Sequence, residues 1–196
     1  MPIKYLFYLL LFTLVICACK QKNPNKDAQD RILATKKRAV SYAAEKKYDL
    51  AVLSIDSALV AQPKNIDLYN TKFNILLRSK KYIDALAVLQ QMHKIEPYNA
   101  EAYSFQGYIN EKLGEDALAQ SYYQKAIQAC KYRATGKIEE FKNKVNIAFL
   151  KQFTQSKAAS ITYIDSLSFR HAGNGFIRDQ KEFIKNFDKQ AFLDAL

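Results

Sequence analysis

Residues 48–63, YDLAVLSIDSALVAQP, decide the fold of this chain because residues 82–97, YIDALAVLQQMHKIEP, repeat their scheme. In both segments a tyrosine stands first, a proline stands last, and Ala51 of the first recurs as Ala85 of the second. The period is 34 residues. Periods of this length mark units that cannot bury their apolar faces alone and therefore stack on one another. We therefore predict a helical repeat protein that offers a binding surface and not a reaction chamber.

The composition predicts that the rest of the chain is helical as well. Of the 196 residues, 49% are hydrophobic and 25% are charged, which is the balance of a folded protein. Only five glycines and four prolines interrupt the chain. Alanine, leucine, lysine, glutamine and glutamate, which favour helices, are abundant. The expected fold class is all-α.

The N-terminus resembles a bacterial export signal. An uncharged and mostly apolar run, residues 5–18, is shorter than the roughly 20 residues that cross a bilayer. Its end resembles a lipobox, in which an aliphatic and a small residue precede an obligatory cysteine, and Ile16 and Ala18 take these places before Cys19. We expect residues 1–18 to be a lipoprotein signal peptide and Cys19 to be lipidated. The alternatives are a signal that is cleaved without lipidation and an uncleaved anchor helix.

A polar tether follows the cysteine. Residues 20–26, KQKNPNK, carry three lysines and no acid, so residues 19–26 are predicted to be the lipidated cysteine and a spacer without regular structure. Lipoproteins that reach the cell surface in some Gram-negative bacteria carry acidic residues here, and this chain does not. The expected location is the outer membrane, facing the periplasm. Cys17 is the weaker lipidation candidate because Ile16 would then occupy the cleavage position.

Three units in residues 27–135 resemble the tetratricopeptide repeat family. They share small residues at positions where helices approach closely: Ala39 and Gly107 within hairpins, and Ala51, Ala85, Ala119, Ala58 and Ala126 elsewhere. Phe73 and Met92 depart from the pattern, and Lys131 stands where a proline is expected. The resemblance implies a right-handed solenoid of helical hairpins. The alternative is chance periodicity in a plain helical bundle.

The repeat register is lost in residues 136–196, although helical spacing continues. Residues 138–153 and 158–167 are read as a fourth, divergent hairpin. A break at residues 171–175 precedes one last amphipathic helix over residues 176–196. The ends of a solenoid need a helix with a polar outer face. The side chains predicted to form that face are Arg178, Lys181, Lys185 and Lys189.

No residue pattern in the chain predicts catalysis or metal binding. His93 and His171 lie far apart, and the chain contains no His-x-x-x-His, Cys-x-x-Cys or Glu-x-x-His spacing that would suggest a metal site. His93 is expected to act as a cation at a helix C-terminus. Cys130 is expected to be a buried structural thiol. No cofactor is expected.

The net charge of +11 does not predict nucleic-acid binding. Residues 27–135 hold 16 basic and 12 acidic side chains, and residues 136–196 hold 10 and 7. Nucleic-acid binders usually gather their basic side chains on one face, whereas here the excess is thinly spread. Attraction to acidic lipid, acidic peptide or anionic wall polymer is more consistent with this distribution.

The resemblance implies that the first helix of each hairpin lines a concave groove that binds a partner. The residues expected to face the groove are Lys36, Val40, Ala43, Asn70, Asn74, Arg78, Ser104, Phe105, Tyr108 and Glu111. The family's clamp for a C-terminal carboxylate uses five basic and amide residues. The matching positions here are Lys36, Val40, Thr71, Glu101 and Phe105, of which only the first fits, so that clamp is expected to be absent.

The function expected from these features is a lipid-anchored, non-enzymatic adaptor or assembly factor of the bacterial cell envelope. Its partner would be another envelope protein or a peptide segment. An accessory subunit that binds cell wall or polysaccharide is the alternative, and an enzyme with catalytic residues in the divergent C-terminal part is a third reading. The oligomeric state is not predicted.

Overall fold

The computed structural model describes residues 24–132 and 137–196, and all regular structure in these ranges is helical. The signal peptide and the lipidation predicted at Cys19 lie outside the described residues. The prediction of an all-α chain is confirmed for the described part. The helices there are α2 (Pro24–Ala44), α3 (Tyr48–Ala61), α4 (Ile66–Arg78), α5 (Tyr82–Ile95), α6 (Ala100–Lys112), α7 (Asp116–Tyr132), α8 (Lys137–Thr154), α9 (Lys157–Arg170), α10 (Gly175–Asn186) and α11 (Lys189–Ala195).

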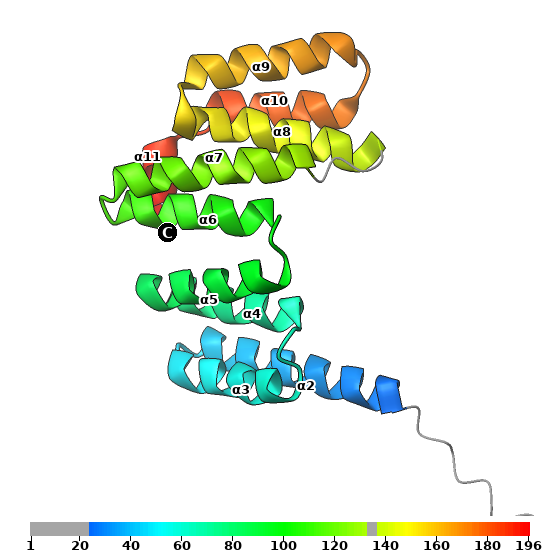
Figure 1. Ribbon diagram of the computed structural model, residues 1–196, viewed down its shortest axis with the longest axis vertical. Helices are drawn as coiled ribbons and strands as arrows, with labels where there is room; N and C mark the ends of the chain where they lie inside the picture. Colours follow the sequence, from blue (N-terminus) through cyan, green and yellow to red (C-terminus); the bar gives the residue numbers. More distant parts are fainter. Residues whose placement is uncertain (1–23, 133–136) are drawn as a thin grey trace, which may run out of the picture.

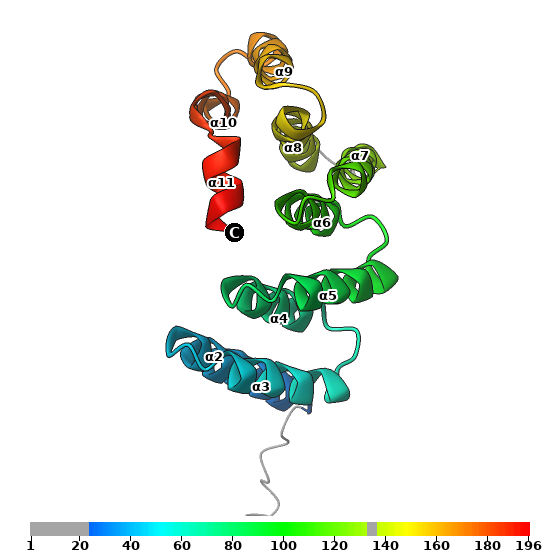
Figure 2. The same cartoon turned by 90° about the vertical axis from the view of Figure 1, so that its left-hand side faces the viewer.

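The helices form antiparallel hairpins that stack along one axis (Figure 1). α2 packs against α3, α4 against α5, α6 against α7 and α8 against α9, and each hairpin also contacts the next. α4 and α6 lie on one side of the stack and α5 and α7 on the other (Figure 2). We call the side of α4 and α6 the inner face. The expected solenoid of helical hairpins is therefore present.

The turn inside each of the first three hairpins repeats one backbone conformation. Lys46 and Lys80 have φ values of 60° and 58°, and Gly114, one further period along, has a φ of 82°. At each turn this left-handed residue donates its N–H to the carbonyl three residues before it, and the next N–H bonds the carbonyl five residues before it. This is the Schellman arrangement that closes a helix. Left-handed backbone is unfavourable for lysine and easy for glycine.

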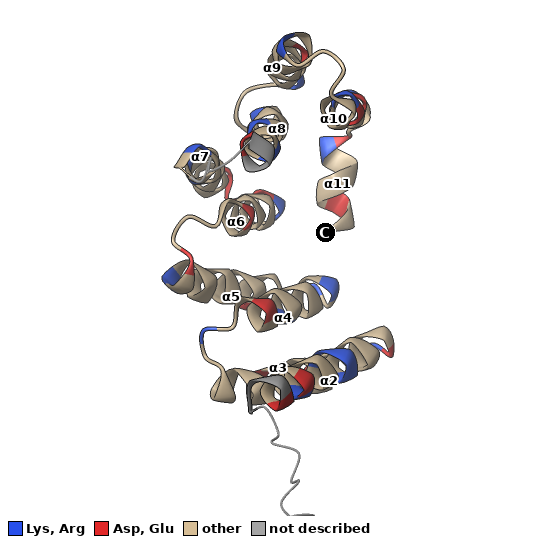
Figure 3. Cartoon of the chain, turned by 90° about the vertical axis from the view of Figure 1, so that its right-hand side faces the viewer, with Lys and Arg blue, Asp and Glu red and all other residues tan. Residues whose placement is uncertain are grey.

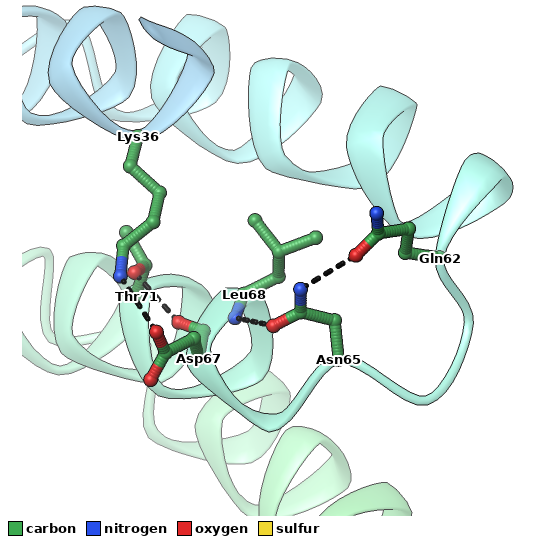
Figure 4. Close-up of polar contacts among 6 residues, drawn as sticks. All are labelled: Lys36, Gln62, Asn65, Asp67, Leu68 and Thr71. Carbon is green, nitrogen blue, oxygen red and sulfur yellow. Dashed lines mark hydrogen bonds and ion pairs between the residues drawn. The ribbon is translucent and has the colours of Figure 1, made fainter. Parts of the chain in front are cut away.

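The connection between hairpins is capped by asparagine. The side chain of Asn65 accepts a hydrogen bond from the N–H of Leu68 at 3.2 Å and donates one to Gln62 at 2.7 Å (Figure 4). One period later, Asn99 accepts from the N–H of Ala102 at 2.9 Å. Each asparagine satisfies a free N–H at the start of the next helix. The caps therefore fix where α4 and α6 begin.

The prolines that mark the period in the sequence hold a second contact of the connection. The hydroxyl of Tyr69 donates to the carbonyl of Pro63 at 3.2 Å, and that of Tyr103 donates to the carbonyl of Pro97 at 3.1 Å. Proline also cannot continue a helix, so α3 and α5 end before it. The tyrosine and the proline thus recur together because they form one contact.

Inside the hairpins, large and small residues exchange places. A Cβ atom on Gly107 of α6 would lie 2.2 Å from the ring of Tyr123 on α7, so only glycine fits there. In the second hairpin the equivalent residues are Phe73 and Leu89, both buried in one cluster. The large side chain now comes from the first helix and the smaller one from the second. This exchange explains why Phe73 does not disturb the hairpin.

The C-terminal part departs from the repeat. The turn between α8 and α9 has no left-handed residue, and Ser156 caps α9 by accepting from the N–H of Ala159. The buried hydroxyl of Ser160 on α9 donates to the carbonyl of Ala148 on α8 at 2.6 Å. Individual polar contacts of this kind replace the repeated turn.

The prediction of a single last helix over residues 176–196 is wrong, because the structure has two helices there. Phe187 is extended, with φ −67° and ψ 129°, and the side chain of Asp188 caps a new helix by accepting from the N–H of Ala191. α10 therefore ends at Asn186, and α11 turns away from it toward the inner face (Figure 2). An aspartate that can cap competes with continuation of a helix, which explains the break.

At the other end of the described chain, α2 begins at Pro24, inside the tether expected over residues 19–26. The fixed φ of proline suits the first turn of a helix. Within the described ranges no helix is both long and apolar enough to span a bilayer.

Candidate functional site

α11 packs against α6 on the inner face, the side of the stack on which α4 and α6 lie (Figure 2). The ammonium of Lys112 on α6 donates to the carbonyl of Leu193 at 2.6 Å, and Lys189 forms an ion pair with Glu111. A cation at the C-terminal end of a helix interacts favourably with its dipole. The candidate site is therefore the space that is left open between α4, α6, α8 and α11, and it comprises two pockets.

One pocket lies between α4 and α6, and we call it the amide pocket. Its volume is about 260 Å³, and the residues that matter here are Asn70 and Asn74 of α4, Asn99, and Glu101 and Phe105 of α6. Asn70 and Asn74 stand one helical turn apart, and neither amide group forms a hydrogen bond with another residue in the described ranges. Both can donate and accept, as the backbone of an extended peptide requires. Three of the residues expected in the groove thus meet here.

A second pocket lies between α6, α8 and α11, and we call it the aromatic pocket. It has a volume of about 410 Å³ and is lined by rings from three helices: Phe105 and Tyr108 of α6, Phe149 of α8 and Phe192 of α11, with Ser104 and Asn146 at its polar side. The volume falls in the range of pockets that bind small ligands or side chains. Ser104, Phe105 and Tyr108 were predicted to face the groove, and all three line this pocket.

Three residues of the aromatic pocket were not predicted as site residues from the sequence: Asn146, Phe149 and Phe192. Phe149 was assigned to helical packing and Phe192 fell in the expected capping helix, since their spacing is that of ordinary core residues. They become pocket residues because α11 returns to the inner face. A cap signal at Asp188 was the one local feature that could have revealed this return.

Glu111 is not open to a partner, contrary to the expectation, whereas Tyr108 lines the aromatic pocket although it is only 6% exposed. Tyr108 is buried, with its ring 5.0 Å from that of Phe192, and burial raises the pKa of its hydroxyl. Glu111 accepts a hydrogen bond from the hydroxyl of Tyr123 at 2.6 Å and pairs with Lys189. Both residues hold α11 and α7 in place, so their contacts are already made within the chain.

The remaining residues expected in the groove lie outside both pockets. Lys36 of α2 forms an ion pair with Asp67 at the start of α4, 3.4 Å long (Figure 4). Val40 is 52% exposed on α2, and Arg78 is exposed in the last turn of α4. Ala43 is buried between α2 and α3, so the prediction that it faces the groove is wrong.

His93 does not act as a charged helix cap. Its Nε2 lies 2.8 Å from the side-chain oxygen of Gln106, and its ring stacks on Tyr103 with centroids 3.8 Å apart. Burial lowers the pKa of His93, so the neutral ring is favoured. Histidine here joins α5 to α6 as an uncharged side chain.

Cys130 is buried, as expected, and is one of the residues that line the aromatic pocket. Burial raises the pKa of its thiol to about 11, so the reactive thiolate is suppressed. Among the described residues, no group of three histidine, cysteine, aspartate or glutamate side chains could hold a metal ion. Both the basic and the acidic residues are spread over several of the described helices (Figure 3).

No protein-family model matches the chain, and no curated protein matches it. Several solved structures, in contrast, are similar to this chain in their fold. A tetratricopeptide repeat protein from Parabacteroides merdae superposes with a TM-score of 0.52 and 16% identity over 90% of this chain and 64% of the other. The double mutant of MamA from strain RS-1 (ArsTM) gives a TM-score of 0.50 and 22% identity over 71% of this chain and 76% of the other. The chain therefore has a fold of the tetratricopeptide-repeat type.

Proposed function

We propose that the protein is a non-enzymatic adaptor that holds an extended segment of another protein on its inner face. The observation that carries this proposal is the pair of adjoining pockets, in which unengaged amide groups stand beside aromatic rings. Amide side chains can bind a peptide backbone, and aromatic residues supply much of the energy of protein interfaces. The two pockets share Glu101 and Phe105, so one segment can cross both.

We further propose that Cys19 anchors this adaptor to a membrane of the bacterial cell envelope, with the outer membrane facing the periplasm as the expected location. The support is the lipobox-like sequence before Cys19. A diacylglycerol thioether together with an amide-linked acyl chain provides the two or more chains that stable anchoring requires. The inner face would then act close to a membrane surface, on a partner that is also an envelope protein.

Photocrosslinking in cells tests the binding surface. A photoreactive phenylalanine analogue replaces Asn74, in the amide pocket, or Gln124, which is exposed on α7 on the opposite side. We expect a discrete crosslinked species from position 74 and none from position 124. Adducts only from position 124, or from neither position, would overturn the proposed site.

Cell fractionation tests the anchor separately. Cys19→Ser removes the thiol that would carry the lipid, and Cys17→Ser is the matched control. We expect Cys19→Ser protein to leave the membrane fraction and Cys17→Ser protein to stay there. Retention of the Cys19→Ser protein in the membrane fraction would show that lipidation at this cysteine is not the anchor.

A further inference from the structure

The acidic residue that lines both pockets, Glu101, has an equivalent one repeat earlier in the chain, Asp67. Asp67 stands in the first turn of α4, and Glu101 stands one period later in the first turn of α6. Asp67 forms an ion pair with Lys36, which lies on the preceding first helix, α2 (Figure 4). One period after Lys36 the chain has Asn70. The acid is therefore kept in the next repeat, while the lysine that neutralises it is replaced.

Glu101 is left without a cation. Its side chain is exposed, and in the described part of the chain the structure records no ion pair or hydrogen bond for it. Among the described residues it is the one charged side chain that lines the amide pocket or the aromatic pocket, and it lines both. A carboxylate in the first turn of a helix also favours the helix dipole, but that benefit applies equally to Asp67. The difference between the two repeats lies in the cation and not in the acid.

The surroundings of Glu101 determine what kind of cation fits. On one side the amides of Asn70 and Asn74 can bind a peptide backbone. On the other side Phe105, Phe149 and Phe192 form the apolar wall of the aromatic pocket. A positively charged side chain with an apolar neighbour on the same segment would satisfy both sides at once.

We propose that the inner face selects a partner segment in which a lysine or arginine adjoins an aromatic or large aliphatic residue. The cation pairs with Glu101 at the place that Lys36 takes in the preceding repeat, and the apolar side chain enters the aromatic pocket. This inference rests on the proposed function, since it specifies the segment held there. The net charge of +11 opposes a cationic partner at long range, but salt screens charges beyond about 8 Å at physiological ionic strength.

A matched pair of labelled peptides tests the charge requirement. Two blocked decapeptides, identical except for a lysine–phenylalanine or a glutamate–phenylalanine pair at their centre, are titrated by fluorescence anisotropy with the full chain purified in detergent. We expect the lysine peptide to bind about tenfold more tightly. Equal affinities would overturn the proposal, and so would the absence of saturable binding of the lysine peptide at about 1 mM protein.

Three variants assign the effect to Glu101. Glu101→Gln should weaken binding of the lysine peptide about threefold, as expected for a partly exposed ion pair. Asn70→Lys restores the lysine of the preceding repeat, so it should neutralise Glu101 internally and weaken binding about tenfold without loss of folding. Glu115→Gln, an exposed acid in the turn between α6 and α7, is the control and should leave binding unchanged. If Glu101→Gln and Asn70→Lys bind like the unaltered chain, the inference is wrong.

The two proposals fail in different ways. A crosslink from position 74 that persists unchanged in Glu101→Gln cells would keep the adaptor and reject the cationic segment. Loss of every crosslink from the inner face would reject both.

Discussion

The first three hairpins and the C-terminal part of the chain are built in different ways. In α2 to α7 the same turn, the same asparagine cap and the same tyrosine–proline contact recur at one period. In α8 to α11 one aromatic cluster joins helices that are distant in sequence, and Lys112 binds backbone carbonyls at the end of α11. Stability in a regular repeat is a sum of neighbour contacts, whereas the aromatic cluster ties the last hairpins to the third.

The largest effect is expected from Phe153, at the centre of that cluster. Its side chain is 3% exposed, and its ring lies 4.9 to 6.3 Å from those of five neighbours: Tyr108, Tyr123, Phe149, Phe187 and Phe192. Phe153→Ala should lower the free energy of unfolding by about 4 kcal/mol, because it removes a buried ring and leaves a cavity. Urea denaturation measures the loss.

Amide hydrogen exchange of the Phe153→Ala protein then tests whether the two parts of the chain open separately. Exchange should accelerate in α11 and in the second half of α6, while α2 and α3 keep their protection. Phe169→Ala, at a ring that is 88% exposed, is the control and should change neither quantity. Uniform acceleration along the chain would mean that the two parts unfold as one unit.

The next effect is expected inside a repeat. Gly107→Ala would place a Cβ atom 2.2 Å from the ring of Tyr123, so the helices α6 and α7 must separate. We expect a loss of about 3 kcal/mol in the free energy of unfolding, which thermal and urea denaturation would detect. Combining Gly107→Ala with Tyr123→Leu reproduces the smaller partner found at Leu89 and should recover part of the loss. No recovery would show that the exchange of large and small residues is not the cause.

A smaller effect, of opposite sign, is expected at the hairpin turns. Lys80→Gly relieves the left-handed strain of lysine but loosens the unfolded chain, so the net stabilisation should be about 0.5 kcal/mol. Gly114→Lys at the equivalent turn should destabilise by about 1 kcal/mol. Thermal denaturation measures both effects: the melting temperature should rise for Lys80→Gly and fall for Gly114→Lys. Identical signs would contradict the equivalence of the turns.

The smallest effect concerns pH. Burial lowers the pKa of His93 below that of an unfolded chain, so the unfolded state binds more protons as the pH falls. The contribution of the neutral ring to the free energy of unfolding is fully present above the unfolded pKa of about 6.5, and it is lost progressively as the pH falls below that value. The difference in unfolding free energy between the unaltered chain and His93→Gln should therefore shrink from pH 7.5 to pH 5. A difference that is constant with pH would contradict the assignment.

The repeat could be predicted from sequence because its residues have local roles. Tyrosine, alanine and proline recur at fixed spacing since each turn and each connection forms the same contacts. The equally periodic Asn65 and Asn99, and the left-handed Lys46 and Lys80, were overlooked although the same spacing marks them. Comparing every position, including polar ones, across the period would have found them.

The candidate site was only partly predictable. Asn70, Asn74, Ser104 and Phe105 face the pockets because position within a first helix determines orientation. Tyr108 and Glu111 have the same orientation, but Phe192 and Lys189, some 80 residues later, cover or pair with them. No local pattern encodes such a contact. The roles of Cys19 and of the groove residues in binding remain predictions that the experiments above test.

The course of α11 has a practical consequence for work with this protein. Its last turn is held by Lys112 on α6, and its end points along the inner face toward α4 (Figure 2). Any polypeptide joined after Leu196 therefore starts beside the pockets, and an affinity tag or fluorescent reporter there would compete with a partner for the same space. The exposed turn at Gly173, between α9 and α10, contributes no residue to either pocket and is the better place for an inserted epitope.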